Sequence, residues 1–324
     1  MLALSRADLE RLLSPADVIQ AVRTAFREAA AGRVRDLPRA VLPLDRGVIF
    51  LAMVAALPRR TALGTKLVTV APQNRRRALP TLHATYVLVD PATGVPLALM
   101  EAGFLTAIRT GATSALAARY LARRDSRVVA CFGAGVQADF QLRCLQAVRP
   151  LERVIVVGRD PARARRFAAR MKKLLGVSVT VERDRAAALA EADVVTCATT
   201  SPTPVFRNRD LRPGTHVDAV GAFQPHTREV DTETVKRARV VVDTYAGAWE
   251  EAGDLLIPIR AGAITRRHVQ AELTDLVSGR KPGRRAREEI TLFKSVGWAA
   301  EDAATARLAY DRARARRIGT NVSL

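Results

Sequence analysis

The segment VVACFGAGVQADFQLRCL, residues 128–145, carries a glycine pattern that could hold a nucleotide phosphate. Gly133, Gly135 and Ala138 form G-x-G-x-x-A between a predicted strand and a predicted helix. Gly133 permits the tight turn, Gly135 lets the backbone approach a pyrophosphate, and the helix N-terminus favours negative charge. Glycines also serve tight turns for steric reasons alone, but here RVIVVGR completes a βαβ unit. The unit as a whole predicts dinucleotide binding.

The end of the second predicted strand, Gly158-Arg159-Asp160-Pro161, bears on which dinucleotide binds. An acid there would bond the ribose 2′-hydroxyl of NAD(H), whereas an arginine would accept the 2′-phosphate of NADP(H). Asp160 before Pro161 fits a helix N-cap, which explains the acid without a cofactor and leaves Arg159 for the phosphate. We therefore predict NADP(H), with NAD(H) as the alternative if Asp160 turns inward. The chain has no G-x-x-x-x-G-K-[ST] motif, so nothing supports a nucleoside triphosphatase.

The elements that would position this site follow two patterns along the 324 residues. The first part mixes predicted helices with predicted strands. The helices are expected at residues 14–32 and 105–123. The strands, in which apolar and polar residues alternate, are expected at 46–57, 63–72 and 82–101. From Val128 onward short apolar strands alternate with helices, which predicts a parallel sheet with right-handed crossovers. The segment 291–316 predicts one long helix that packs back on the N-terminal part.

These patterns predict an α/β fold with two domains. A Rossmann-type parallel-sheet domain, residues 119–298, is inserted in a smaller α+β substrate domain. That smaller domain comprises residues 1–118 and is completed by residues 299–324.

The composition limits the classes of function. The formal net charge is +20, aromatic residues make up only 5%, and the arginines are spread along predicted helices, so a solvated helical face is preferred to a nucleic-acid surface. No apolar run reaches the roughly 20 residues of a membrane helix, and the N-terminus reads as a short amphipathic helix without an export signal. Cys131, Cys144 and Cys197 share no CxxC spacing and are expected to be buried thiols of a cytoplasmic protein, with no metal site.

Several further segments resemble the ornithine cyclodeaminase/μ-crystallin family, in the family's order and over nearly the whole chain. They are KLVTVAPQN, LPTLHA, VDPATGVPLALME, LTAIRTGATSALAARYLA, GAGVQA, VGAFQPHTREVD and FKSVGWAAEDAATA. The family contains cyclodeaminases, alanine dehydrogenases, cyclic ketimine reductases and the μ-crystallins. The resemblance implies a homodimer formed through the α+β domain, in which each subunit binds a nicotinamide dinucleotide and a small amino or imino acid.

The resemblance also assigns residues. Arg39, Lys66 and Arg109 are implied as binders of the substrate carboxylate, since cationic side chains, arginine above all, suit a carboxylate in a closed pocket. Lys66 could also protonate the imine nitrogen, because burial among cations would lower its pKa. Without the resemblance, Arg39 reads as a surface ion pair and Lys66 as a snorkelling strand lysine. For the cofactor the resemblance points to Thr81, Thr110, Gly135, Val136, Gln137, Arg159, Thr199, Val220, Gly221 and Ser295.

Phe223 and Val296 complete the expected substrate pocket, and Phe223 is a departure from the family. The cyclodeaminases carry an essential aspartate at this position, and a phenylalanine cannot perform the proton transfers of cyclodeamination. Nearby Glu229 and Asp231 are expected to be structural, and the role of Asp218 is open. We therefore predict a reductase of small cyclic ketimines, 1-pyrroline-2-carboxylate to proline or the six-membered homologue to pipecolate. The alternatives are an ornithine cyclodeaminase, an alanine-dehydrogenase-like oxidoreductase and a non-catalytic NADPH- or hormone-binding protein.

Overall fold

The computed structural model describes residues 1–323, apart from the side chains of Arg60 and Arg75, and the chain divides into two compact units. Unit 1 comprises Met1–Arg109 together with Trp298–Leu324. Unit 2 comprises Thr110–Gly297. Within the described residues no helix is both long and apolar enough to cross a membrane.

Unit 1 is built on an eight-stranded sheet. Its strands are β1 (Leu2–Leu4), β2 (Arg35–Asp36), β3 (Ala40–Pro43), β4 (Ile49–Leu57), β5 (Ala62–Val70), β6 (Leu82–Val89), β7 (Pro96–Glu101) and β16 (Thr320–Asn321). The order is β16-β1-β7-β6-β5-β4-β2, with β3 also paired to β4, and the central strands β4 to β7 are antiparallel. Its helical elements are α1 (Arg6–Leu12), α2 (Pro15–Ala30), α11 (Ala299–Arg316) and the 3₁₀ turns η1 (Asp45–Gly47), η2 (Pro58–Arg60) and η3 (Pro72–Arg77).

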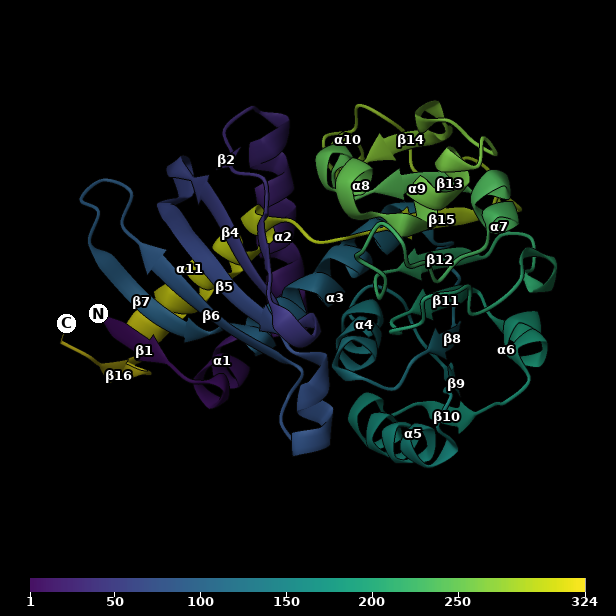
Figure 1. Ribbon diagram of the computed structural model, residues 1–324, viewed down its shortest axis with the longest axis horizontal. Coiled ribbons are helices and arrows are strands. Elements are labelled where there is room, and N and C mark those ends of the chain that lie inside the picture. Colours follow the sequence, from purple (N-terminus) through teal and green to yellow (C-terminus); the bar gives the residue numbers. More distant parts are fainter. Residues whose placement is uncertain (324) are drawn as a thin grey trace. The chain divides into compact units, whose positions relative to one another are not determined.

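Helix α11 covers one face of this sheet and crosses strands β4, β5 and β6 (Figure 1). The buried side of the helix consists largely of alanines, among them Ala300, Ala303 and Ala306, and these small side chains let the helix lie close to the strands. On β5 the residues facing α11 are the alternate ones, because successive side chains of a strand point to opposite faces. This alternation places Lys66 on the covered face.

Unit 2 is built on a second eight-stranded sheet in which every pairing is parallel. Its strands are β8 (Val128–Phe132), β9 (Arg153–Val157), β10 (Ser178–Val181), β11 (Val194–Cys197), β12 (His216–Ala219), β13 (Arg239–Val242), β14 (Val269–Glu272) and β15 (Thr291–Lys294). Its helices are α4 (Val136–Gln146), α5 (Pro161–Leu175), α6 (Arg185–Glu191), α7 (Thr232–Arg237), α8 (Tyr245–Glu251), α9 (Gly253–Arg260) and α10 (Leu273–Val277), with the 3₁₀ turns η4 (Asn208–Asp210) and η5 (Arg266–His268). Helix α3 (Ala102–Leu121) begins in unit 1 and ends in unit 2.

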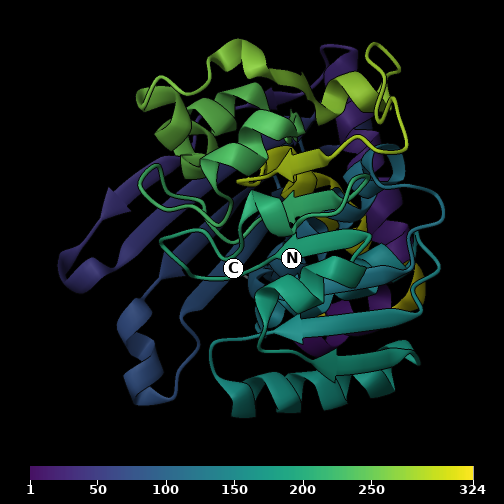
Figure 2. The same ribbon diagram turned by 90° about the vertical axis from the view of Figure 1, so that its right-hand side faces the viewer.

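The strand order of unit 2 is β10-β9-β8-β11-β12-β15-β13-β14, and Figure 2 shows these strands following one another through the sheet. The chain leaves β8 toward β9 on one side and later returns to β11 on the other, so the order reverses at β8. Open parallel sheets bind ligands at the carboxyl ends of the strands beside such a reversal. The predicted Rossmann-type sheet is confirmed.

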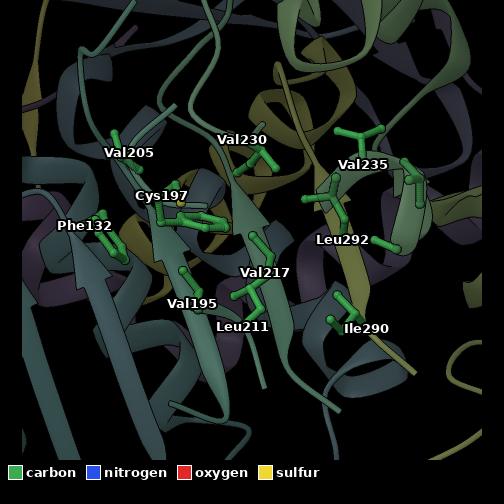
Figure 3. Close-up of a cluster of buried hydrophobic side chains, with 14 of the residues drawn as sticks. Phe132, Val195, Cys197, Val205, Leu211, Val217, Val230, Val235, Ile290 and Leu292 are labelled. Carbon is green, nitrogen blue, oxygen red and sulfur yellow. The ribbon is translucent and has the colours of Figure 1, made fainter. Parts of the chain in front are cut away.

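The core of unit 2 lies on both faces of its sheet, because alternate residues of each strand point to opposite sides. Phe132, Cys197, Val217 and Leu292 belong to the cluster on one face (Figure 3), and Cys131 belongs to the cluster on the other. All three cysteines are buried and unpaired by disulfides, and burial raises the pKa of the Cys131 and Cys144 thiols to about 12. The prediction of buried thiols is confirmed.

The segment 291–316 corrects the prediction of one long helix. Thr291–Lys294 forms strand β15 between β12 and β13, and helix α11 begins only at Ala299. The four residues of β15 are all buried, and so short a buried run has no periodicity that separates a strand from a helix. Ser295 therefore follows a strand and does not cap a helix. The first residues are also divided, into strand β1 and helix α1, where one helix was expected.

Candidate active site

The buried charges of unit 1 centre on Lys66 of β5. Its side chain is 1% exposed, and Nζ donates a hydrogen bond to Asp302 Oδ2 at 2.6 Å. Asp302 lies in the first turn of α11, where the helix dipole favours a carboxylate. Because Nζ is enclosed and ion-paired, Lys66 does not reach solvent as a snorkelling lysine would.

Arg109 of helix α3 shares the same carboxylate. Its Nε donates to Asp302 Oδ1 at 3.0 Å and its Nη1 donates to Glu301 Oε2 at 2.7 Å, and the side chain is almost fully buried. Asp302 therefore accepts from Lys66 and Arg109 on separate oxygens. One carboxylate fixes the spacing of the two cations.

Burial and charge act against each other on this cluster. Burial lowers the pKa of Lys66 to about 7, and repulsion from Arg109 and Arg39 acts in the same direction while Asp302 opposes it. Burial acts to raise the pKa of Asp302, but Arg109 and Lys66 outweigh it, so that pKa lies below its ordinary value. Asp302 is thus an anion at neutral pH, and the Lys66 ammonium releases its proton far more readily than that of an exposed lysine.

Arg39 supplies an additional positive charge. It is half-buried and close enough to Lys66 to repel the proton on Nζ. Three cationic side chains, Arg39, Lys66 and Arg109, thus lie close together in unit 1, and such a group of cations favours a small carboxylate as its ligand.

Three partners in this cluster were missed in the sequence: Glu301, Asp302 and Tyr86. The only trace of the acids was the pair of carboxylates in AAEDAATA, at the start of a helix. Tyr86 lies opposite Lys66 in the register of β6 with β5, and its hydroxyl is buried without a hydrogen-bond partner among the described residues. A Cβ on Gly64 would come within 2.6 Å of that hydroxyl, so the glycine of GTK makes room for the tyrosine.

The glycine loop of unit 2 has the form predicted for a pyrophosphate cradle. Gly133 has φ +119°, and a Cβ there would lie 2.5 Å from the carbonyl oxygen of Ala198. Gly135 is the N-cap of α4, and no backbone blocks the space beside it. Val136 is exposed, and the buried Gln137 Oε1 has no hydrogen-bond partner among the residues that the structure describes. A helix N-terminus, two glycines and an unsatisfied amide suit a dinucleotide.

Asp160 caps helix α5, as predicted. Its Oδ1 accepts from the N–H groups of Ala162 at 2.9 Å and Arg163 at 3.1 Å, which occupies the acid without any cofactor. Arg159 beside it is exposed. A pocket of about 350 Å³ adjoins the glycine loop, and its lining residues are Ala134, Gly135, Val136, Arg163, Arg166, Phe167 and Arg170. Arg163 and Arg166 are thus basic residues near the loop that sequence reasoning did not single out, and Arg159 is not among the lining residues.

Glu229 ties together the ends of β11 and β12. Its Oε1 accepts from Thr199 N at 2.6 Å and Thr199 Oγ1 at 2.7 Å, and its Oε2 accepts from Gly221 N at 2.6 Å and Ala222 N at 3.1 Å. The Thr199 hydroxyl also accepts from the N–H of Ser201, so its hydrogen bonds are used inside the protein. The N–H groups of Thr199 and Gly221 and the Thr199 hydroxyl are therefore used inside the protein, where they hold the ends of β11 and β12 in place.

Glu229 is itself held by a buried ion pair. Asp254 Oδ1 accepts from the N–H groups of Glu229 and Val230, and Asp254 Oδ2 lies 2.8 Å from Lys294 Nζ. Lys294 also donates to the carbonyl oxygen of Ala222. Burial and Asp254 raise the pKa of Glu229, and Lys294 opposes that shift. Lys294 thus pairs with Asp254, and its positive charge opposes the rise in the pKa of Glu229.

Asp243 performs a similar task for the residues after β15. Its Oδ2 accepts from Ser295 Oγ at 2.7 Å, Val296 N at 2.8 Å and Gly297 N at 2.7 Å. Ser295 is thus a donor to Asp243. The backbone of Ser295-Val296-Gly297 is held at the carboxyl edge of the sheet.

The remaining predicted residues lie as follows. Val220 is nearly buried after β12, and Phe223 is half-buried in the loop beyond it. Thr110 is the first residue of unit 2, is 9% exposed and lies on α3, and Thr81 precedes β6 in unit 1. Unit 1 therefore brings together Arg39, Lys66 and Arg109. In unit 2 the glycine loop, Thr199, Val220, Gly221 and Ser295 follow the carboxyl ends of β8, β11, β12 and β15.

Comparison with known proteins gives consistent matches over the whole chain. Residues 1–317 match the model of the Ornithine cyclodeaminase/mu-crystallin family. The Delta(1)-pyrroline-2-carboxylate reductase of Bacillus cereus is 37% identical over 324 residues, 99% of each protein. The structure of the Thermococcus litoralis Delta(1)-pyrroline-2-carboxylate reductase with NADH and L-proline matches with a TM-score of 0.97 at 43% identity, covering 99% of this chain and 100% of that one. An archaeal alanine dehydrogenase dimer with bound NAD matches with a TM-score of 0.94 at 34% identity, covering 100% and 99%.

The role of Lys294 can be tested by replacing it with methionine. Lys294→Met leaves the buried Asp254 and Glu229 without a cation, and we expect the free energy of unfolding at pH 8 to fall by about 3–5 kcal/mol. Without Lys294 the folded-state pKa of Glu229 rises further above its unfolded value, so the variant loses stability as the pH rises. The loss should therefore be smaller at pH 5 than at pH 8 in urea melts.

Lys236→Met is the matched control, because Lys236 forms an exposed ion pair with Glu233. That substitution should change stability by less than about 1 kcal/mol at either pH. A Lys294→Met protein as stable as the parent at pH 8 would contradict the proposed neutralisation.

Proposed function

Because the chain belongs to the ornithine cyclodeaminase/mu-crystallin family, we propose that it is an NAD(P)H-dependent reductase of small cyclic ketimines. The reaction is 1-pyrroline-2-carboxylate to proline, or 1-piperideine-2-carboxylate to pipecolate. The observation that carries the proposal is the buried cluster in which Asp302 holds Lys66 and Arg109 beside Arg39. The relatives named Delta(1)-pyrroline-2-carboxylate reductase support the same substrate class.

In this proposal the cations of unit 1 bind the substrate carboxylate. Arg39 and Arg109 offer guanidinium N–H groups, which pair well with carboxylate oxygens, and Lys66 adds a third donor. Carboxylate binding orients the ring and brings its nitrogen to Lys66. The Lys66 ammonium then gives a proton to the imine nitrogen, and a pKa of about 7 suits that transfer at neutral pH. The bound dinucleotide would supply the hydride to the imine carbon.

For the dinucleotide we propose the carboxyl edge of the unit 2 sheet. Gly133, Gly135, Val136 and Gln137 would take the pyrophosphate, and the backbone after β11, β12 and β15 would face the rest. We propose NADP(H) as the preferred cofactor, since Asp160 is occupied as a cap and Arg159 is exposed beside it. The NADH in the Thermococcus litoralis enzyme keeps NAD(H) as the alternative.

Phe223 favours the reductase over an ornithine cyclodeaminase. Cyclodeamination needs a base for the second amine and for ammonia release, and a phenylalanine cannot serve. The acids nearest in sequence are engaged elsewhere, because Glu229 accepts from the ends of β11 and β12 and Asp231 caps helix α7. Asp218 is buried within strand β12 beside His216.

We also propose a cytoplasmic homodimer. The sheet of unit 1 is covered by α11 on one face, whereas Leu67 and Leu99 on its other face are exposed, as are Val41 and Leu42 of β3. Exposed apolar side chains on one sheet face are typical of an association surface. The dimer of the related alanine dehydrogenase supports the same assembly.

The activity itself is the first test. The purified protein should oxidise NADPH in the presence of 1-pyrroline-2-carboxylate and form proline, and it should release no ammonia from ornithine with NAD. Coupled ultraviolet and ammonia assays measure both. Ammonia and proline formed from ornithine faster than the ketimine is reduced would overturn the assignment, and absence of turnover with every cyclic imine would favour a binding protein.

Lys66 gives a further prediction. Lys66→Met should lower kcat for reduction by about 10²–10⁴, since it removes the proton donor, while NADPH affinity stays near that of the parent. Lys66→Arg keeps the positive charge but does not release a proton at neutral pH, so its KM should change less than its kcat. In the parent, kcat/KM should fall as the pH rises through about 7, because only protonated Lys66 donates. Parent-like turnover by Lys66→Met would show that Lys66 is structural.

Cofactor choice is tested at Arg159. Arg159→Ala should weaken NADPH binding by roughly tenfold to a hundredfold, because a charge-assisted phosphate contact contributes about 1.5–3 kcal/mol, and NADH binding should change little. Arg165→Ala, an exposed arginine on α5, is the control and should alter neither. Equal losses for both cofactors at Arg159→Ala would remove the 2′-phosphate contact from the proposal.

Assembly is tested by light scattering. The parent should have twice the mass of the 35.2 kDa chain. A Leu67→Glu/Leu99→Glu variant should shift toward the monomer, because charges on an apolar contact surface lose their hydration. Glu substitutions at exposed Arg185 and Arg267 of unit 2 serve as controls and should leave the mass unchanged. A monomeric parent would contradict the dimer.

A further inference from the structure

Unit 2 contains a second basic concavity, which we call the arginine pocket. Its volume is about 430 Å³, and its lining residues are Arg119, Tyr120, Ala122, Arg123, Arg124, Arg284, Arg285, Ala286 and Arg287. Six of these residues are arginines, and no acidic residue is among the described lining residues. The volume falls within the range of about 300–1,000 Å³ that is usual for small-molecule sites.

The arginine pocket lies at the amino edge of the unit 2 sheet. One side is formed by the end of α3 and the turn before β8, and the other by the segment before β15. The glycine loop follows the carboxyl end of β8, at the opposite edge. The two basic sites are therefore separate within unit 2.

Arg149, which is buried, and Arg284, which is half-buried, support the pocket without any carboxylate among their hydrogen-bond acceptors. Arg284 donates to the carbonyls of Leu121 and Glu289 and to Thr291 Oγ1, and Arg149 donates to the carbonyls of Ala118 and Ala122. Carbonyl groups satisfy the N–H donors but do not cancel the charge. Burial and repulsion from Arg123 lower the pKa of Arg284 to about 10, so it is still a cation at neutral pH.

Two further arginines share two acids at the margin of the pocket. Arg123 pairs with Asp193 and with Asp125, and Arg287 Nη2 lies 2.6 Å from Asp125 Oδ2. The backbone nitrogen atoms of Arg127 and Val128 also donate to Asp193. These acids are thus already shared among several donors.

The last three arginines carry the inference. Arg119, Arg124 and Arg285 are exposed, and none forms an ion pair or side-chain hydrogen bond with the part of the chain that the structure describes. Some other exposed arginines of the unit, such as Arg127 and Arg170, do pair with acids. Three guanidinium groups without an ion pair among the described residues thus line one concavity, beside the buried Arg149 and the half-buried Arg284, although the Glu289 carboxylate accepts from the backbone N–H of Arg285. Together they form a site of concentrated positive potential.

We propose that the arginine pocket binds a small molecule that carries two or more linked phosphate groups. Guanidinium groups bind phosphate oxygens through paired hydrogen bonds. Because several guanidinium groups line the pocket from two sides, a ligand that balances them needs more negative charge than one carboxylate provides. A phosphate chain could bridge Arg119 and Arg124 on one side to Arg285 on the other. The ring of Tyr120 in the same lining offers a surface for an organic group, so both an inorganic chain and a nucleoside polyphosphate have this chemistry.

The test uses the full chain saturated with NADPH, so that the dinucleotide site is occupied. Isothermal titration with inorganic tripolyphosphate at low salt should show one site per chain that weakens as salt is added. An Arg119→Gln/Arg124→Gln/Arg285→Gln variant should lose at least tenfold in affinity. The control variant Arg185→Gln/Arg237→Gln/Arg267→Gln has the same change in net charge at exposed arginines outside the pocket and should stay within twofold.

Two further measurements identify the kind of ligand and detect a folding defect. ATP in place of tripolyphosphate decides the source, since tighter binding of ATP would indicate a nucleotide and equal binding an inorganic chain. Each single Gln variant is measured beside the triple variant, with a thermal melt, so that a folding defect in one does not stand for a binding loss. No saturable binding to the parent, or equal losses in the pocket and control variants, would overturn the proposal.

Discussion

The ion pairs of Asp302 with Lys66 and Arg109 are the interaction on which the substrate side of this protein depends. Lys66 lies in a strand, Arg109 in helix α3 and Asp302 in the last helix, 236 and 193 residues away along the chain. Removing one partner of a buried pair leaves an uncompensated charge, which costs about 3–5 kcal/mol, so these elements hold the charges as a set. The C-terminal helix therefore does more than cover the sheet. It fixes the cations that a small carboxylate would meet.

The same rule organises the dinucleotide edge of unit 2. In the irregular loops after β11, β12 and β15, several N–H groups lie beyond the strand pairing. Glu229, Asp243 and Asp254 accept from these groups, and Lys294 pairs with Asp254. Acids that look like candidate catalysts in the sequence are thus part of the framework. Their hydrogen bonds hold the backbone that a cofactor would contact.

Several arginines of unit 2 gather at the amino edge of its parallel sheet. Helices in such a sheet run opposite to the strands, so their negative C-terminal ends gather at the amino edge. Arg149 and Arg284 compensate the negative end of one such helix, because both donate to carbonyl groups at the end of α3. Arg119, Arg124 and Arg285 at the same edge donate to no such carbonyl in the described part of the chain, and they line the arginine pocket. The net charge of +20 is therefore concentrated in part, although the sequence suggested an even spread.

The sequence by itself determined the features that depend on near neighbours. These are the G-x-G-x-x-A turn, the Asp160 cap, the alternating strand that carries Lys66, and the segments that resemble the family. Only the tertiary structure decided which distant groups meet: Asp302 with Lys66, Glu229 with the strand ends, and residues 119–124 with 284–287. Such pairings leave no period in the sequence, because they depend on how whole elements pack. Strand β15 was misassigned for a related reason, since only its two neighbours in the sheet make four buried residues a strand.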